Sequence, residues 1–418
     1  MYFKKIFILF LFVNSIVLGQ NYFNRVIGNR INNNSAKSLS MGGVGFMNNE
    51  TSSTAIINPA SLMNNNGWKV DANNNNNFTS EYRSFPSIDS FENTFSNLTY
   101  VYNSNNNSLS KVGMMYVNNS FGFSVSTGPF ISTDYNYIEE VRNSDDELEG
   151  YYQFETNGTI NCNSFGLGIA LNDKFYFGFS INQLTDKSFG IFGERQNSFT
   201  THYKFLSEEI SFRSNKIVNN FFESISAIIK PSLNTEFAFG FEKPIGMEYI
   251  SSVSIEMNDD INLPSYEPTD TLVQNILYKP SYFRFGFIHT SKQIRNHSIS
   301  FEYEKANYSN FKIDSRKLLD VHTLSVGVEY LLYNFPPLRL GLTHNTSPFR
   351  SDLSKTIFSV GTGLDYRTAS LDVGCRYWNV SYPYQDIFPN ENDLSNPFST
   401  EIVKENNLDL LISLQIRI

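Results

Sequence analysis

Apolar and polar residues alternate with a period of two along many short segments of the chain. Residues 174–182 read KFYFGFSIN, and the last residues, 410–418, read LLISLQIRI. Similar runs occur at 164–171, 323–330 and 371–378. Because successive side chains of a strand point to opposite faces, this period predicts β-strands that have one apolar face.

The two faces of these predicted strands differ in composition. One face carries Phe, Leu, Ile and Val, and the other carries mostly Gly, Ser, Thr and Asn with a few charges. A soluble sandwich would show more Lys and Glu on the face that meets water, whereas a transmembrane barrel turns its apolar face to lipid. The chain also ends on a strand, at Ile418, which suits pairing of the last strand with the first. The sequence therefore predicts an all-β fold, a transmembrane antiparallel β-barrel.

Connections between the predicted strands alternate in length. Short connections fall at 172–173, 230–233, 289–296, 333–337 and 367–368. Long polar connections fall near 133–150, 191–209, 258–281, 306–321, 346–354 and 382–406. Short periplasmic turns and long outer loops are typical of outer-membrane barrels, and the count reaches about 14 strands. Only the segment 234–257, which contains Pro244 and Gly246, fits this count poorly.

The first predicted strands are 66–83, 96–104 and 111–132, and the last of these changes phase. The apolar positions switch from even to odd numbers on either side of Asn118 and Asn119. Such a switch requires either a tight turn or one bulged residue within a single long strand. If it is a turn, we expect the segment 66–83 to drop out as a strand and the total to stay unchanged.

The N-terminus predicts export. Lys4 and Lys5 precede an apolar run over 6–18, and the small residue Gly19 follows. This order of features describes a secretory signal peptide, residues 1–19. The run is shorter than the roughly 20 residues that a membrane-spanning helix needs. No apolar run of that length follows, so a membrane location depends on the barrel.

Composition and motifs narrow the function classes. The 418-residue chain carries a formal net charge of −9, which argues against nucleic acid as a partner. Aromatic residues make up 15% of the chain, so a disordered chain is excluded. The five histidines lack metal-ligand spacing, and no phosphate-binding loop or nucleophile elbow is present. We therefore expect neither an enzyme nor a metal or cofactor site.

Residues 20–65 do not alternate and predict a compact element outside the barrel wall. They contain Gly42 and Gly43, which permit tight backbone, and the run Asn58, Pro59 and Ala60, in which the proline ends any preceding helix. Two interpretations are open. The element forms a plug inside the lumen, or it is an ordered periplasmic tail. The domain organisation expected is a signal peptide, a plug over 20–65 and a barrel over 66–418.

Charged residues on the polar face are the candidate ligand contacts. Phase places nine of them in the lumen: Arg284, Glu302, Glu304, Glu329, Arg339, Asp365, Asp372, Arg376 and Arg417. In one interpretation these charges pair across strands as a structural ladder. In the other, one arginine remains to hold a ligand carboxylate. Arg284 and Arg339 are then the candidates, because each lies among glycine and aromatic residues rather than beside an acid on its own strand.

The two cysteines are not expected to form a disulfide. By phase, Cys162 faces the lumen and Cys375 faces lipid, on strands that lie far apart around the barrel.

The chain resembles the FadL-type long-chain fatty acid transporters of the outer membrane. The resemblance rests on the Gly-Gly run, on the run Asn58-Pro59-Ala60-Ser61-Leu62, and on phrases at 225–231, 298–308 and 337–342. It implies a monomeric fourteen-stranded barrel, closed by an N-terminal plug, that passes hydrophobic small molecules such as long-chain fatty acids. It also implies a kink in the third strand that opens a lateral exit, which favours the bulge at Asn118 and Asn119.

The resemblance sets the functional expectation and its alternative. We expect an outer-membrane barrel for passive uptake of hydrophobic small molecules, with release into the surrounding lipid. The PorV-type barrels of the type IX secretion system have a comparable Asn-Pro-Ala run. The alternative is therefore a secretion-system barrel that binds exported proteins.

Overall fold

The computed structural model describes most of the chain. The described residues are 27–31, 35–47, 50–88, 94–132, 135–142, 148–157, 159–185, 200–204, 208–218, 220–257, 271–291, 297–313, 316–331, 335–385 and 400–418. The predicted signal peptide lies outside them.

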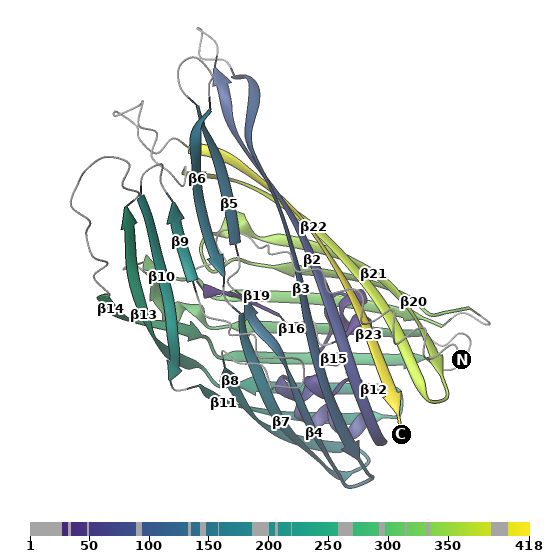
Figure 1. Ribbon diagram of the computed structural model, residues 1–418. Coiled ribbons are helices and arrows are strands. Elements are labelled where there is room, and N and C mark those ends of the chain that lie inside the picture. The colour runs from purple at the N-terminus through teal and green to yellow at the C-terminus, as the bar shows by residue number, and fades with distance from the viewer. Residues whose placement is uncertain are drawn as a thin grey trace, which may run out of the picture.

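Fourteen antiparallel strands form a closed barrel, as the alternation predicts (Figure 1). They are β2 (Gly67–Ile88), β3 (Thr94–Val117), β4 (Phe121–Ser132), β7 (Thr159–Asn172), β8 (Phe175–Thr185), β11 (Phe221–Ser232), β12 (Thr235–Glu242), β15 (Tyr282–Ser291), β16 (His297–Ala306), β19 (Val321–Tyr330), β20 (Leu338–Asn345), β21 (Lys355–Tyr366), β22 (Ala369–Gln385) and β23 (Thr400–Arg417). Each pairs with its neighbours, β23 closes against β2, and β4 closes against β7.

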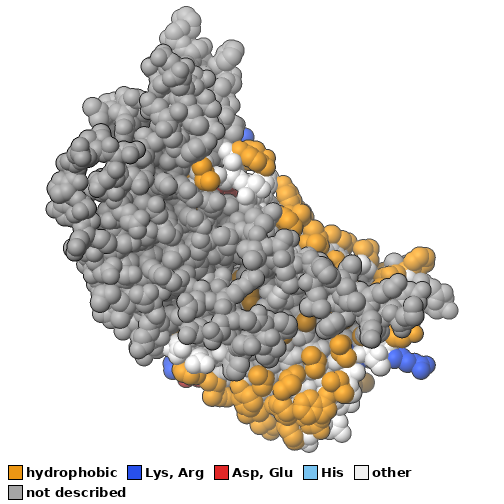
Figure 2. Space-filling model, viewed as in Figure 1, with side chains coloured by type: hydrophobic (Ala, Val, Ile, Leu, Met, Phe, Trp, Pro, Cys, Tyr) orange, Lys and Arg blue, Asp and Glu red, His pale blue; other side chains and the backbone are white. Residues whose placement is uncertain are grey.

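The outer face of the barrel is apolar. In β8, Phe175, Phe177, Phe179 and Ile181 are exposed, while Ser180 and Asn182 are buried inside. Figure 2 shows hydrophobic side chains gathered on the outer surface of the described barrel wall. No helix among the described residues is long and apolar enough to cross a membrane.

A second sheet extends the barrel at the end with the long connections. Its six strands are β5 (Tyr135–Arg142), β6 (Leu148–Asn157), β9 (Thr200–Lys204), β10 (Glu208–Val218), β13 (Ile245–Met257) and β14 (Thr271–Lys279). This sheet explains the segment 234–257, because β12 ends before Pro244 and β13 pairs with β10 and β14 instead of the barrel. The other outer connections contain η3 (Tyr308–Asn310), β17 (Lys312–Ile313), β18 (Arg316–Lys317) and η4 (Ser351–Leu353).

The bulge expected at Asn118 and Asn119 is wrong. These residues form the turn between β3 and β4, where the Asn118 amide donates to the Phe121 carbonyl at 2.9 Å. The Asn118 side-chain oxygen also accepts from the amides of Ser120 and Phe121. The segment 66–83 nevertheless remains a strand, because the predicted strand 96–104 and the start of 111–132 belong to one strand, β3.

The inner segment, residues 35–65, lies within the barrel (Figure 1). It contains α3 (Ala36–Ser40), η1 (Ser52–Ile56) and η2 (Pro59–Asn64), and nearly all of its side chains are buried. Ten inward-facing glycines of the wall make room for it: Gly113, Gly166, Gly168, Gly178, Gly240, Gly286, Gly327, Gly341, Gly361 and Gly374. A side chain on Gly178, for example, would overlap the backbone of Ala60.

Wall side chains hold the inner segment by its backbone. The five amide-to-oxygen bonds are Ala36 to Ser413 at 2.7 Å, Gly42 to Ser359 at 2.8 Å, Met47 to Glu302 at 2.6 Å, Ser52 to Asp71 at 2.8 Å and Ala60 to Ser226 at 2.9 Å. Three of these amides, those of Ala36, Ser52 and Ala60, belong to the first turn of a short helix, which leaves them without a partner in the helix. Within the segment, the Asn58 side chain donates to the Phe46 carbonyl at 2.6 Å, which joins its two halves.

Candidate functional site

The hydrogen-bond ladder of the barrel wall is interrupted between β3 and β4. These strands pair only from Val112–Thr127 to Val117–Gly122. Farther toward the outer end, β3 continues to pair with β2, while Ile131 and Ser132 of β4 pair with the short strand β1 (Asn29–Arg30). We call this region the β3–β4 interruption. The N-terminal strand β1 therefore pairs with the edge of β4 that β3 does not cover.

Lys111 occupies the inner side of the β3–β4 interruption. Its ammonium donates to the Ile31 carbonyl at 2.9 Å. The side chain lies against Gly128, where a Cβ atom would come within 2.6 Å of Lys111 and the φ angle is +154°. Only glycine tolerates both the angle and this close approach, so the β4 backbone and Lys111 fit together there.

Glu242, at the outer end of β12, is fully buried among three cations. Its carboxylate contacts Arg30 at 2.7 Å, Lys279 at 2.8 Å and Arg284 at 2.9 Å. Arg284 also contacts Glu304 of β16 at 2.6 Å. We call these five residues the Glu242 network. It joins the N-terminal strand, the outer sheet and the barrel wall at one point.

The Glu242 network keeps unused hydrogen-bond donors. The ring of Tyr282 lies 4.0 Å from the guanidinium carbon of Arg30 and 4.9 Å from that of Arg284. Within the described residues, Nε and Nη1 of Arg30 and Nη2 of Arg284 are buried without a hydrogen-bond partner. Buried donors of this kind are costly unless a ligand or water satisfies them.

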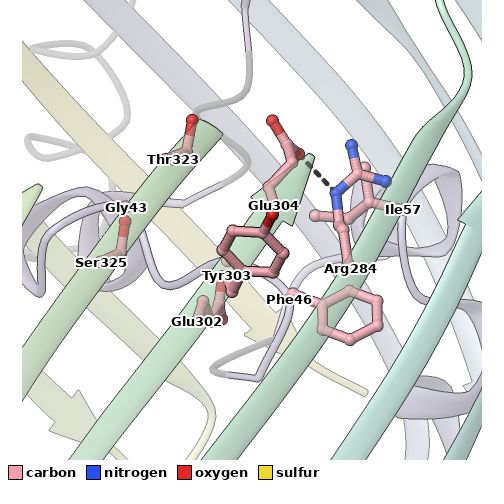
Figure 3. Close-up of a pocket in the computed structure, with 10 residues that line it drawn as sticks. Gly43, Phe46, Ile57, Arg284, Glu302, Tyr303, Glu304, Thr323 and Ser325 are labelled. Carbon is pink, nitrogen blue, oxygen red and sulfur yellow. Dashed lines mark hydrogen bonds and ion pairs between the residues drawn. The ribbon is translucent and has the colours of Figure 1, made fainter. Parts of the chain in front are cut away.

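A cavity of about 60 Å³ lies between the inner segment and the wall, beside Arg284 (Figure 3). Its lining comes from the inner segment and from β15, β16 and β19: Gly43, Gly45, Phe46, Ile57, Arg284, Glu302, Tyr303, Glu304, Thr323 and Ser325. Figure 3 shows the guanidinium of Arg284 and its bond to Glu304 above the ring of Phe46. The cavity therefore combines an apolar floor with charged and hydroxyl groups.

An apolar cluster leads from this cavity toward the β3–β4 interruption. Its buried members are Ile56, Ile57, Phe130, Ile131, Ile160, Cys162, Leu184 and Phe222. Ile57 belongs to both the cavity lining and the cluster. Phe130 and Ile131 lie on β4, where β1 pairs. Buried apolar side chains thus connect the cavity with the β3–β4 interruption.

Arg339 lies in a separate group of charges, which we call the Arg339 network. Its guanidinium contacts Glu329 at 2.6 Å and Asp372 at 2.5 Å, and Lys37 of α3 contacts Glu329 at 3.5 Å. Lys37 also contacts Glu50 at 2.7 Å, and its charge lowers the pKa of the Glu50 carboxyl. None of these residues lines the cavity.

The structure therefore separates the two arginines that the sequence singled out. Arg284 lines the cavity and Arg339 does not. Both are paired with acids on other strands of the wall, so neither is an arginine left over for a ligand carboxylate. The cross-strand ladder is the interpretation that the contacts support. Cys162 is buried in the lumen and Cys375 lies on the outer face, as their phase predicts.

Sequence reasoning missed Arg30, Glu242 and Lys279. A signal for Glu242 exists, because residues 235–242 read TEFAFGFE and place it on the same face as Gly240. Arg30 and Lys279 lie outside the barrel strands, where alternation gives no information.

No protein-family model and no curated protein sequence matches the chain. Solved structures do. A FadL homologue from Pseudomonas aeruginosa superimposes with a TM-score of 0.64 at 13% identity, covering 93% of this chain and 99% of the other. The chain has the fold of the FadL-type channels.

Two further structures of this fold belong to toluene transporters. The toluene transporter TodX of Pseudomonas putida gives a TM-score of 0.62 at 11% identity, over 94% of this chain and 99% of TodX. The toluene transporter TbuX of Ralstonia pickettii gives 0.60 at 11% identity over the same shares. At these identities the likeness to FadL-type channels establishes the barrel architecture.

Proposed function

We propose that this protein is an outer-membrane channel for passive uptake of hydrophobic small molecules. The observation that carries the proposal is the apolar cluster, which links a lumen cavity with the β3–β4 interruption of the wall. An interrupted ladder beside lipid offers cargo a route into the bilayer. The driving force is transfer of apolar surface out of water, about 0.8 kcal/mol for each CH₂ group.

The inner segment acts as the plug in this proposal. It meets ten glycines around the wall, and wall side chains hold its backbone amides. Packed in this way, the inner segment blocks the lumen, so the channel excludes hydrophilic solutes. The plug residues Gly42 and Ala60 lie at two of the closest contacts with the wall.

The proposed route has three steps. A compound first places its polar end in the cavity, where Nη2 of Arg284 donates a hydrogen bond to it. Its apolar part then displaces side chains of the apolar cluster next to Ile57. Finally, β1 separates from β4 and the compound leaves through the β3–β4 interruption. Arg339 has no part in this route, because its network lies away from the cavity.

The proposed cargo class is hydrophobic, which includes the expected long-chain fatty acids as well as hydrocarbons such as the toluene that TodX and TbuX transport. The likeness to transport channels does not favour the alternative of a secretion-system barrel.

An uptake experiment tests the proposal. The protein is expressed in the outer membrane of a host that lacks its own uptake channel, and accumulation of a labelled long-chain fatty acid and of toluene is measured. Wild type should exceed the empty host for at least one of them. Ile57→Gln should reduce this uptake, because it places an amide between the cavity and the apolar cluster.

The matched control is Leu233→Gln, since Leu233 is 97% exposed in the turn between β11 and β12. No uptake above the empty host would exclude the proposed function. Equal uptake by wild type and Ile57→Gln would exclude the route through the cluster.

A further inference from the structure

The backbone of β1 holds it only weakly to the wall. It pairs with β4 over two residues, Asn29 and Arg30, and the Ile31 amide donates to the Phe130 carbonyl at 2.8 Å. Because the net gain from each backbone hydrogen bond is small, a strand this short needs side-chain contacts to stay in place. Those contacts decide how firmly β1 covers the β3–β4 interruption.

The Arg30 side chain ties β1 to a distant part of the wall. Its guanidinium contacts the Glu242 carboxylate at 2.7 Å, and it lies 4.9 Å from the ring centre of Phe130 and 4.0 Å from that of Tyr282. Phe130 belongs to β4, whereas Glu242 and Tyr282 belong to β12 and β15. The strands β7, β8 and β11 lie between β4 and β12 in the wall. One side chain therefore joins the edge of the β3–β4 interruption to strands well away from it.

The Glu242 network holds one positive charge more than its two carboxylates neutralise. Three cations contact Glu242, and one of them, Arg284, also contacts Glu304. Glu302 adds no charge to this count, because no cation among the described residues contacts it and a desolvated carboxyl of this kind favours its neutral form. Like charges held together in a buried site repel, and the buried Nε and Nη1 of Arg30 lack a partner within the described residues. Both costs belong to the closed position of β1.

Departure of β1 balances the charges that stay behind. When Arg30 leaves, Lys279 and Arg284 remain with Glu242 and Glu304, two cations with two carboxylates. Glu242 keeps contacts of 2.8 Å and 2.9 Å, so no buried carboxylate loses its last cation. Opening thus costs the Arg30 ion pair and its ring contacts, and it relieves the repulsion among the three cations.

We infer that Arg30 is the latch of the exit, and that the extra positive charge of the Glu242 network makes this latch easy to release. The ion pair with Glu242 and the two rings hold β1 closed. Repulsion from Lys279 and Arg284 favours the open position. Arg30 is a positioning residue, since it acts through β1. This inference rests on the proposed function and names what controls its last step.

The native thiol of Cys162 reports opening without any cargo. Cys162 is 2% exposed, belongs to the apolar cluster, and pairs with Gly128 of β4 beside the β3–β4 interruption. Its rate of reaction with N-ethylmaleimide is measured on purified protein in a Cys375→Ala background, where it is the single thiol. Uptake of toluene is measured for the same variants in cells.

Two substitutions at the same carboxylate should have opposite effects. Arg30→Met should speed labelling at least about tenfold, because the closed strand loses its ion pair. Lys279→Met should slow labelling about tenfold, because the closed network is then balanced and opening would leave two buried carboxylates with Arg284 alone. Each variant removes one cation from Glu242, so a purely structural role would change both rates in the same direction.

A control and a second variant complete the set. Lys243 follows Glu242 in the sequence but pairs with Glu223 and is well exposed, so Lys243→Met should label at the rate of wild type. Glu304→Gln raises the surplus of positive charge and should speed labelling. It keeps the test decisive if Lys279→Met fails to fold.

Uptake should follow the order of the labelling rates. Labelling of Lys279→Met as fast as wild type would overturn the inference, and so would equal rates for Arg30→Met and wild type. Toluene uptake that persists in either case would leave the proposed function standing. The expected order of labelling without uptake by any variant would support the latch and contradict the proposed function.

Discussion

The Glu242 network and the Arg339 network are built from the same kinds of residues but differ in what they connect. In the first, one buried carboxylate holds three cations that come from the N-terminal strand, the outer sheet and the wall. In the second, one arginine holds two carboxylates of the wall, and Lys37 adds a single contact from the inner segment. The first lies at a cavity and keeps unused donors.

This difference teaches which charges serve a ligand and which serve the fold. Cross-strand ion pairs whose hydrogen-bonding groups are all in use stabilise the wall. A network that joins three separate parts of the chain and leaves donors unused beside a cavity is suited to binding. The following experiments test that distinction, from the largest expected effect to the smallest.

Removal of the Glu242 carboxylate should have the largest effect on stability. Glu242→Gln leaves Arg30, Lys279 and Arg284 buried without their common partner. We expect a loss of about 3–5 kcal/mol in the free energy of unfolding, measured by urea titration of the barrel in detergent. A loss smaller than that of Arg339→Met would contradict the ranking of the two networks.

Filling the space at Gly341 should displace the inner segment. A side chain there would overlap the backbone of Gly42, so Gly341→Val should cost about 1–3 kcal/mol. It should also admit hydrophilic solutes, measured as faster entry of a small polar antibiotic into cells. The control is Thr362→Val, on the lipid-facing side of β21. Unchanged permeability of the glycine variant would argue against the inner segment as a plug.

Arg339→Met should lower stability by about 1–3 kcal/mol and leave uptake intact. It removes the cation that the half-buried carboxylates of Glu329 and Asp372 share and leaves Glu329 only the 3.5 Å contact with Lys37, which is a cost to the fold. Arg284→Met should instead reduce uptake, since Arg284 lines the cavity. The comparison of the two arginines fails if both variants reduce uptake to the same extent at equal amounts of folded protein.

Lys37→Met should have the smallest effect, about 0–1 kcal/mol, because its partner Glu50 is half exposed and screened by water. Lys37 lowers the pKa of Glu50, so this contribution is present at neutral pH and is lost as the pH falls through the lowered pKa. The unfolding free energies of wild type and variant should therefore converge in acid. A difference that grows below pH 4 would contradict this assignment.

Alternation allowed the barrel, its strand number and the inward direction of Arg284 and Arg339 to be predicted from sequence. Period two is a local property, and a closed barrel imposes it on every strand. It also marks exceptions. Leu411 is apolar on the polar face of β23, and the structure shows that it packs against Ala36 and Leu39 of the inner segment.

Two features were out of reach for the same method. A turn and a bulge produce the same change of phase in the alternation, so the sequence pattern cannot distinguish them. The family resemblance favoured the bulge at Asn118, which is wrong. The Glu242 network joins Arg30 to a residue 212 positions away, and neither Arg30 nor Lys279 lies on an alternating barrel strand. Contacts between residues so far apart in the sequence depend on how the inner segment and the outer sheet pack in the folded protein.

The central claim is that cargo leaves where β1 covers β4, and a reversible cross-link tests it most directly. Asn29 and Ser132 are opposite each other on these strands, within the reach of a disulfide. The variant Asn29→Cys with Ser132→Cys is made in a Cys162→Ala, Cys375→Ala background. The control joins Val112→Cys to Thr127→Cys, where β3 and β4 are already paired.

We expect the oxidised β1–β4 variant to lose uptake of the hydrophobic compound and to regain it with a reductant, while the control takes up the compound in both states. Uptake by the oxidised β1–β4 variant at the rate of the reduced protein would contradict release through the β3–β4 interruption.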